Sequence, residues 1–170
     1  MSERKLGIEP AAGPEDMAVL RALFIEYQDR LGVDLCFQGF EAELASLPGN
    51  YAPPAGGVWL AHVDGALAGC VGLRPHGGGA CEMKRLWVRP GFRGLGLGRR
   101  LAETGIAAAG RAGYRTLCLD TLGFMDAAQA LYQTLGFHEI PAYYDNPLED
   151  VRYLELDLSE ARAAVHATCG

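Results

Sequence analysis

The residues that can bind a phosphate group are concentrated in the stretch Cys81–Arg100. Six side chains in this stretch are basic, whereas its only acid is Glu82. Gly94, Gly96 and Gly98 let the backbone approach a ligand closely, and the residues that follow have the apolar spacing of a helix. Because the free N–H groups and the dipole of a helix N-terminus favour an anion, the stretch predicts a phosphate site.

Two common phosphate-binding motifs do not fit these glycines. A Walker loop requires Lys and then Ser or Thr after its second glycine, but Leu97 and Gly98 occupy those positions. A dinucleotide fingerprint requires Gly-x-Gly-x-x-Gly within a βαβ unit, whereas the glycines here alternate as Gly-x-Gly-x-Gly. General nucleic-acid binding is also disfavoured, because the basic residues are local and the net charge of the chain is −6.

The same residues resemble a third signature. Arg93–Gly98 (RGLGLG) is similar to the Arg/Gln-x-x-Gly-x-Gly/Ala motif of the GNAT superfamily of acetyl-CoA-dependent N-acetyltransferases. Ala130–Phe137 (ALYQTLGF) resembles the second signature of that superfamily, a helix that carries a tyrosine and closes on Gly-Phe. The resemblance implies the GNAT fold, a mixed α/β sheet with splayed central strands, and acetyl-CoA as the acyl donor.

The resemblance also implies which residues bind acetyl-CoA. The pyrophosphate is expected on the loop and first helical turn, and the pantetheine arm on the preceding strand, like an added strand. Asp126 stands where the family often has an asparagine that contacts the cofactor arm. The resulting set of cofactor-binding residues is Leu86, Trp87, Val88, Arg93, Gly94, Leu95, Gly96, Leu97, Gly98, Arg99 and Asp126.

Glu82 is the predicted general base. It precedes Arg93 by eleven residues, the offset at which some GNAT members carry a catalytic glutamate. In a regular strand, Lys84, Leu86 and Val88 would lie on the same face as Glu82. The alternative is a structural ion pair between Glu82 and Lys84 or Arg85.

Tyr132 matches the tyrosine of the family that protonates the leaving thiolate or orients the thioester. On its own, a tyrosine on an apolar helix face is more often a core residue. General acid–base help of this kind typically contributes about 10²–10⁴-fold to the rate. We therefore expect Tyr132 to be the second catalytic residue.

The acceptor is predicted to be a small-molecule amine or an amino-acid-like amine. Acids and aromatic rings suit a cationic amine, and they occur in the first helices and before the last strand. The predicted acceptor-binding residues are Tyr27, Phe37, Tyr143 and Tyr144. A protein or peptide amine, and a CoA-binding regulatory module without turnover, remain the alternatives.

The elements that position these residues follow the order βααβββαβαββ. Strand Cys81–Val88 leads into the glycine loop, helix Leu97–Ala112 follows the loop, and helix Met125–Leu135 carries the predicted catalytic tyrosine. Asp64-Gly65 is a strong hairpin signal between two apolar strands. No internal period is visible, which excludes a solenoid. The length suits one domain with a sizeable core, and with the resemblance residues 1–170 are expected to form a single GNAT domain.

Composition narrows the cellular context. No apolar run approaches the ~20 residues of a spanning helix, and no apolar signal core follows the N-terminus, so we expect a cytoplasmic protein without membrane or nucleic-acid partners. The five cysteines lack zinc-site spacing, and no metal is expected. Cys70, Cys81 and Cys118 fall in predicted strands and are expected to be buried. The resemblance allows a homodimer.

Overall fold

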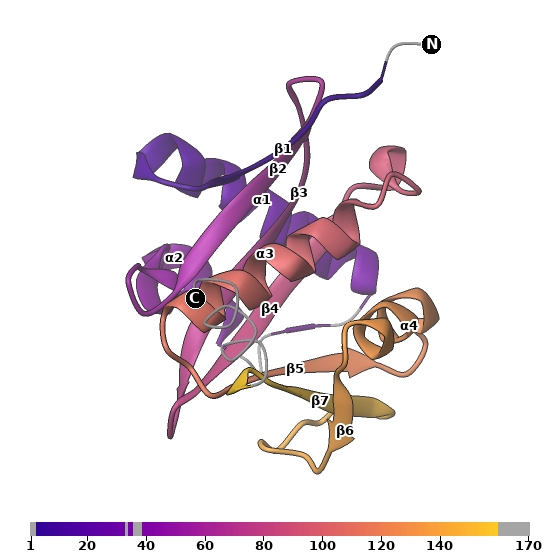
Figure 1. The fold of residues 1–170 in the computed structure, drawn as a ribbon. Helices are drawn as coiled ribbons and strands as arrows, with labels where there is room; N and C mark the ends of the chain where they lie inside the picture. The colour runs from indigo at the N-terminus through magenta and orange to yellow at the C-terminus, as the bar shows by residue number, and fades with distance from the viewer. Residues whose placement is uncertain (1–2, 33, 36–38, 160–170) are drawn as a thin grey trace, which may run out of the picture.

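The computed structural model describes residues 3–32, 34–35 and 39–159. Its described residues form one sheet in the order β1-β2-β3-β4-β5-β7-β6 (Figure 1). Neighbouring strands run antiparallel, except that β4 and β5 are parallel. The strands are β1 (Leu6–Pro10), β2 (Gly57–Val63), β3 (Ala66–Gly77), β4 (Ala80–Val88), β5 (Thr116–Leu122), β6 (His138–Ile140) and β7 (Val151–Asp157).

The helices complete the predicted order βααβββαβαββ, which is confirmed. Pro14 in the first turn and Gly32 at φ 70° begin and end the first helix, as their conformational preferences favour. The helices are α1 (Gly13–Leu31), α2 (Phe40–Ser46), α3 (Leu97–Arg111) and α4 (Asp126–Thr134), with short 3-10 turns η2 (Gly49–Tyr51) and η3 (Pro90–Phe92).

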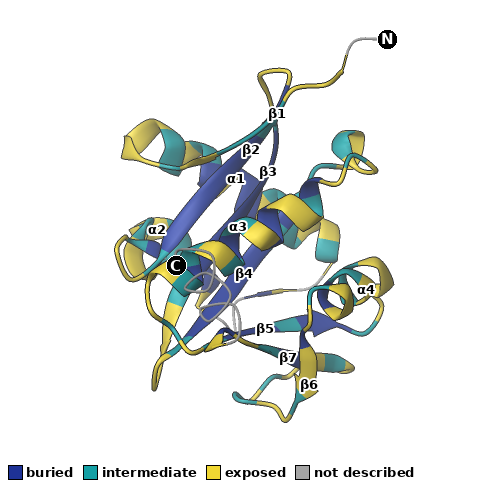
Figure 2. Cartoon of the chain, in the orientation of Figure 1, coloured by how far each residue is buried: buried dark blue, intermediate teal, exposed yellow. Residues whose placement is uncertain are grey.

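Two apolar clusters cover the two faces of the sheet. One cluster contains residues of α3 and α4, and the other contains residues of α1 and α2. The central strands β2, β3 and β4 are accordingly the most deeply buried part of the sheet (Figure 2). Helix α3 packs closely on this sheet, because a Cβ on Gly105 would lie 3.0 Å from the Sδ of Met83. The helix N-terminus is thus fixed against the strand that precedes the glycine loop.

The predicted hairpin turn is present between β2 and β3. Asp64 and Gly65 have φ values of 51° and 83°, the combination that two-residue hairpin loops require. The predicted burial of Cys70, Cys81 and Cys118 is also confirmed, since each is at most 3% exposed. Within the described part of the chain, no helix is both long enough and apolar enough to cross a membrane.

The parallel strands β4 and β5 separate soon after they meet. They pair only where Ala80–Glu82 faces Thr116–Cys118, and beyond these residues the ribbons diverge (Figure 1). Strand β5 continues to pair with β7 along its other edge. The divergence opens a space in the middle of the sheet, as the GNAT resemblance implied.

Strand β4 contains a bulge that changes the direction of its side chains. Cys70 of β3 pairs with Trp87 and Gly72 pairs with Lys84, so β4 has one more residue than β3 between these pairs. Arg85 takes up the extra residue with φ at 60°. A bulge of this kind puts two successive side chains on one face.

The predicted strict alternation along β4 is therefore wrong beyond Lys84. Leu86 and Val88 pack in the α3 cluster with Met83, whereas Trp87 packs in the α1 cluster. Leu86 and Val88 do not share a face with Glu82, so they do not desolvate it. The sequence pattern missed this because a bulge shifts the period of two by one residue.

Candidate active site

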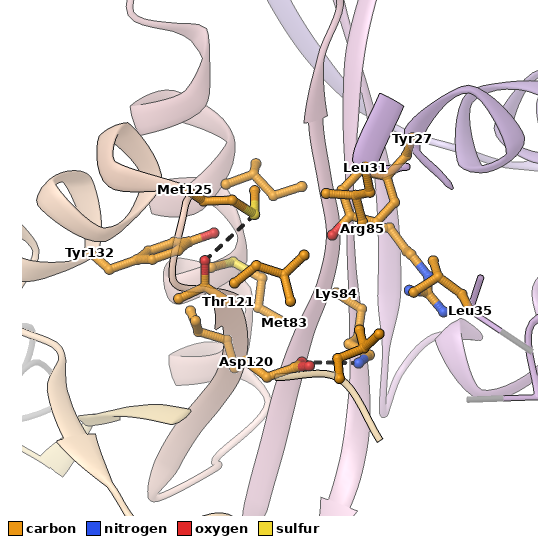
Figure 3. A pocket seen from close by; sticks show the side chains of 14 residues that line it. Tyr27, Leu31, Leu35, Met83, Lys84, Arg85, Asp120, Thr121, Met125 and Tyr132 are labelled. Atoms are coloured by element: carbon orange, nitrogen blue, oxygen red, sulfur yellow. Dashed lines mark hydrogen bonds and ion pairs between the residues drawn. The ribbon is translucent and has the colours of Figure 1, made fainter. Parts of the chain in front are cut away.

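A small cavity lies where β4 and β5 separate, and we call it the splay cavity. Its volume is about 50 Å³. Met83 and Leu86 of β4, Thr121 of β5 and Tyr27 of α1 contribute to its lining. Figure 3 shows Met83, Thr121, Met125 and Tyr132 converging on this space from one side and Tyr27 facing it from the other.

Tyr132 reaches the splay cavity from α4. Its ring packs edge-to-face on Phe137 with centroids 5.5 Å apart, and the residue is 6% exposed. Its hydroxyl points toward the cavity (Figure 3). Burial raises the pKa of Tyr132, so the hydroxyl stays protonated at neutral pH and can donate a hydrogen bond or a proton.

A larger open cleft adjoins the splay cavity beside α4, and we call it the α4 cleft. Its volume is about 650 Å³, and Tyr27, Leu86 and Met125 line both spaces. Phe124 at its edge is 66% exposed. The predicted cofactor-binding residues that line the α4 cleft are Leu86, Trp87, Val88, Arg93, Gly98 and Asp126.

Arg93 is the cation of this group. Its guanidinium lies 5.3 Å from the centroid of the Trp87 ring, and its Nε donates to the carbonyl of Val88 at 3.4 Å. These contacts fold the side chain back over the end of β4. The charge is thereby presented at the cleft, where it can meet an anionic ligand.

The other predicted loop residues do not line the α4 cleft. Gly94 and Gly96 adopt φ values of 81° and 78°, and Gly96 caps the start of α3. Leu97 is buried in the core and Leu95 is half-buried against it, so the Leu97 side chain is turned away from a ligand on the loop. Arg99 is bonded to Glu103 and Thr134 at 2.9 and 3.1 Å, which holds its side chain between α3 and α4.

Glu82 is deeply buried and bonded to residues distant in the sequence. It is 2% exposed. Its Oε1 accepts from Nε of Arg74 at 2.9 Å and lies 2.8 Å from Nη2 of Arg74. Its Oε2 accepts from the Tyr143 hydroxyl at 2.7 Å, and Lys84 is 3.8 Å from the same oxygen. The main ion-pair partner is therefore Arg74 of β3, a residue that no sequence motif singled out.

A second cavity lies around Arg74, and we call it the Arg74 cavity. Its volume is about 380 Å³. It brings together Tyr143 and Tyr144, two of the predicted acceptor-binding residues, whereas Tyr27 lies at the other two spaces. Phe37 lies outside the described residues. The cavity is lined by Asn50, Arg74, Pro75, His76, Glu82, Lys84, Tyr143 and Tyr144.

Lys84 and Asp120 form the boundary between the splay cavity and the Arg74 cavity. Lys84 lines both spaces, and its Nζ lies 3.1 Å from Oδ1 of Asp120 across the two strands (Figure 3). The Tyr144 hydroxyl donates to Oδ2 of Asp120 at 2.5 Å. Burial raises the pKa of Asp120, but the Lys84 charge and the Tyr144 hydrogen bond together lower it below its ordinary value.

These ion pairs belong to one network that spans four elements. Glu43 of α2 lies 2.9 Å from Nε of Arg85 and 3.5 Å from Nη1 of Arg74. Through Glu82 and Lys84 the network continues to β5. Sequence reasoning named only a pairing of Glu82 with Lys84 or Arg85 and missed the other ion pairs. The partners of Glu43 are 31 and 42 residues away from it, and Asp120 is 36 residues from Lys84. The one signal for such a network in the sequence was an acid, Glu82, within a predicted buried strand.

One group of side chains has metal-ligand types. The ligand atoms of His76, Glu82 and Cys118 lie within 4.8 Å of one another. However, Glu82 is already paired with Arg74, and burial raises the pKa of the Cys118 thiol to about 12. A cation would have to compete with a guanidinium and displace a thiol proton, so these residues fit a metal poorly.

Comparisons with known proteins agree with this geometry. The sequence matches the acetyltransferase (GNAT) domain family over residues 54–139. It is 39% identical to an uncharacterized N-acetyltransferase of Schizosaccharomyces pombe, over 94% of this chain and 99% of that protein.

Solved structures share the same fold. A GNAT-family acetyltransferase of Staphylococcus aureus superposes with a TM-score of 0.75 at 22% identity, over 91% of this chain and all (100%) of that one. A putative acetyltransferase of Salmonella typhimurium, determined with its cofactor acetyl-CoA, gives a TM-score of 0.67 at 21% identity, over 91% and 95% of the two chains. The chain belongs to the GNAT family of N-acetyltransferases.

Proposed function

We propose that the protein transfers the acetyl group of acetyl-CoA to the primary amine of a small-molecule or amino-acid-like acceptor. The observation that carries this proposal is that three spaces adjoin one another in a row. The α4 cleft shares Leu86 with the splay cavity, and the splay cavity shares Lys84 with the Arg74 cavity. A donor on one side and an acceptor on the other would thus meet where β4 and β5 separate.

The α4 cleft has the features that a CoA ligand requires. Arg93 supplies a cation for the pyrophosphate, and the N-terminus of α3 supplies backbone N–H groups that have no partner within the helix. The edge of β4 that faces the splay forms no ladder with β5 beyond Glu82, so it is open to an extended pantetheine arm. Bound acetyl-CoA supplies the activated acyl group.

Tyr132 is the proposed general acid. In the transfer, a bond forms between the amine nitrogen and the acetyl carbon, the carbon–sulfur bond breaks, and CoA leaves as a thiol. The protonated hydroxyl of Tyr132, directed into the splay cavity, would supply the proton that the sulfur receives.

Glu82 is the proposed general base, acting directly or through water. Arg74 and Tyr143 fix its carboxylate at the wall of the Arg74 cavity. The acceptor amine must lose a proton to attack, and Glu82 would receive it. Replacing the carboxylate with an amide in Glu82→Gln should lower kcat/KM by about 10²-fold or more. An unchanged kcat/KM with an unchanged pH profile would remove Glu82 from this role.

A free-thiol assay tests the proposed reaction. Acetyl-CoA is incubated with amino acids, simple amines and short peptides, and thiol release is followed together with the mass of the product. Acetylated small amines support the proposal. Acetylation of peptides alone would favour a protein acceptor, whereas acetyl-CoA binding without thiol release would favour a non-catalytic CoA-binding module.

A further inference from the structure

The Arg74 cavity presents hydrogen-bond donors rather than open carboxylates. Both oxygens of Glu82 already accept, one from Arg74 and the other from Tyr143. The hydroxyl hydrogen of Tyr144 is donated to Asp120. Burial raises the pKa of both tyrosines, so they stay neutral. Both carboxylates thus already have hydrogen-bond partners, although Oε2 of Glu82 has a second lone pair that can accept a proton.

Arg74 is the most exposed of the ion-paired side chains around the cavity. The side chain of Arg74 is 24% exposed, whereas those of Glu43 and Glu82 are 9% and 2% exposed. The side chains of Lys84 and Asp120 are 5% and 12% exposed, and Asp120 is not among the residues that line the cavity. The most exposed of these charges is therefore the positive charge of Arg74, although the whole chain carries a net charge of −6.

Arg74 has hydrogen-bonding capacity left for a ligand. A guanidinium has five N–H groups. Among the described residues, Arg74 directs one from Nε and one from Nη2 to Glu82, and a third from Nη1 toward Glu43. Two N–H groups remain, and His76 and Asn50 line the same cavity. The planar fork of arginine is well matched to a carboxylate.

We propose that the acceptor is an amine that also carries a carboxylate, and that Arg74 binds this carboxylate. The amine then extends toward Glu82 and the Lys84–Asp120 pair, at the boundary with the splay cavity. This inference rests on the proposed acetyltransferase function and specifies its acceptor. It differs from the expectation of a site built from acids and aromatics, because the tertiary structure adds two cations to Tyr143 and Tyr144.

Matched acceptor pairs test the proposal. The kcat/KM for several amino acids is compared with that for their carboxamides, which differ only in the charged group. The carboxamide also has the less basic amine, so more of it is neutral, and chemistry alone would favour it. Because only the acid offers Arg74 a charged hydrogen-bond partner, we expect kcat/KM for the acids to exceed that for the carboxamides about tenfold or more.

Variants at Arg74 test whether this residue binds the carboxylate of the acceptor. Arg74→Gln should reduce the acid-to-amide ratio toward one, and Arg74→Lys, which keeps a charge beside Glu82, should give an intermediate ratio. Arg111→Gln, on the exposed last turn of α3, is the matched control and should preserve the ratio. Since the ratio compares two acceptors on one enzyme sample, it is independent of the folded fraction.

The outcomes separate this inference from the proposed function. Carboxamides acetylated as well as the acids, or a ratio that Arg74→Gln leaves unchanged, would overturn the acceptor assignment while the acetyltransferase function stands. If no amine releases thiol, calorimetric titration of the CoA-loaded protein decides, with the acid expected to bind at least tenfold more tightly than its amide. Equal binding would overturn the assignment, and failure to bind CoA would contradict the proposed function itself.

Discussion

Replacing Tyr132 with phenylalanine separates catalysis from stability. The substitution removes one hydroxyl and keeps the ring that packs on Phe137. The hydroxyl of Tyr132 has no hydrogen bond to any described residue, so its removal forfeits none within that part of the chain. We expect the free energy of unfolding to change by less than about 1 kcal/mol.

The catalytic effect of the same change should be much larger. Losing a general acid typically lowers the rate about 10²–10⁴-fold. At 1.36 kcal/mol per factor of ten, a hundredfold loss corresponds to about 2.7 kcal/mol of transition-state stabilisation. Tyr132→Phe should therefore lower kcat by about a hundredfold or more, with little change in the Kd for CoA.

The assay needs three measurements on each protein. Thiol release at saturating acetyl-CoA gives kcat, calorimetry gives the Kd for CoA, and urea unfolding gives stability. A single-turnover experiment is added because slow product release can conceal a change in the chemical step.

Tyr114→Phe is the matched control. The Tyr114 hydroxyl donates to the carbonyl of Ala55 at 2.6 Å, and Tyr114 lines none of the three spaces of the candidate site. Loss of the Tyr114 hydroxyl should reduce the free energy of unfolding by about 0.5–1.5 kcal/mol without lowering kcat. An unchanged single-turnover rate in Tyr132→Phe, or a loss explained by weaker CoA binding alone, would refute the general-acid assignment.

Three further predictions follow from single contacts. Gly96→Asp should abolish measurable CoA binding, whereas Gly96→Ala, which has the same strain at φ 78° without the charge, should retain most of it; equal losses would contradict a phosphate site. Glu43→Gln should lower the free energy of unfolding by about 3–5 kcal/mol, because Arg85, whose side chain is 2% exposed, loses its carboxylate partner. For Glu41→Gln, which changes an exposed acid of the same helix, urea unfolding should show a change of less than about 0.5 kcal/mol in the free energy of unfolding. The folded-state pKa of Asp120 is lowered from 3.8, so its contribution to stability is present above that value and is lost as the pH falls through the folded pKa. Asp120→Asn should therefore flatten the loss of stability measured below about pH 4, and an unaltered pH profile would argue against the depressed pKa.

Some site residues could be recognised from the sequence because their neighbours in the chain define them. The glycine loop needs residues that tolerate positive φ, and Gly94 and Gly96 both adopt it. The helix that carries Tyr132 was predicted from its apolar spacing, and the structure directs the tyrosine into the sheet opening. In each case the signal and the structural requirement lie within a few residues of each other.

Other features of the site depend on residues that meet only after folding. Arg74 reaches Glu82 across neighbouring strands, and Tyr143 reaches it from 61 residues further along the chain. The neighbours of Glu82 in the chain suggested Lys84 or Arg85 as its partner. Lys84 lies 3.8 Å from Glu82, but Arg85 pairs with Glu43 instead. Proximity in the sequence did not identify Arg74, Tyr143 and Glu43 as partners, because an ion pair or hydrogen bond depends on distance in space and not on separation along the chain.

The sequence by itself determined the order of the strands and helices, the hairpin at Asp64-Gly65 and the loop that precedes α3, because these depend on local backbone preferences and apolar period. The tertiary structure alone decided the bulge at Arg85, which turns Leu86 and Val88 away from Glu82. It also decided which charged side chains line the Arg74 cavity. Both follow from the pairing of β3 with β4, since register and cross-strand contact are properties of two segments together and not of either one.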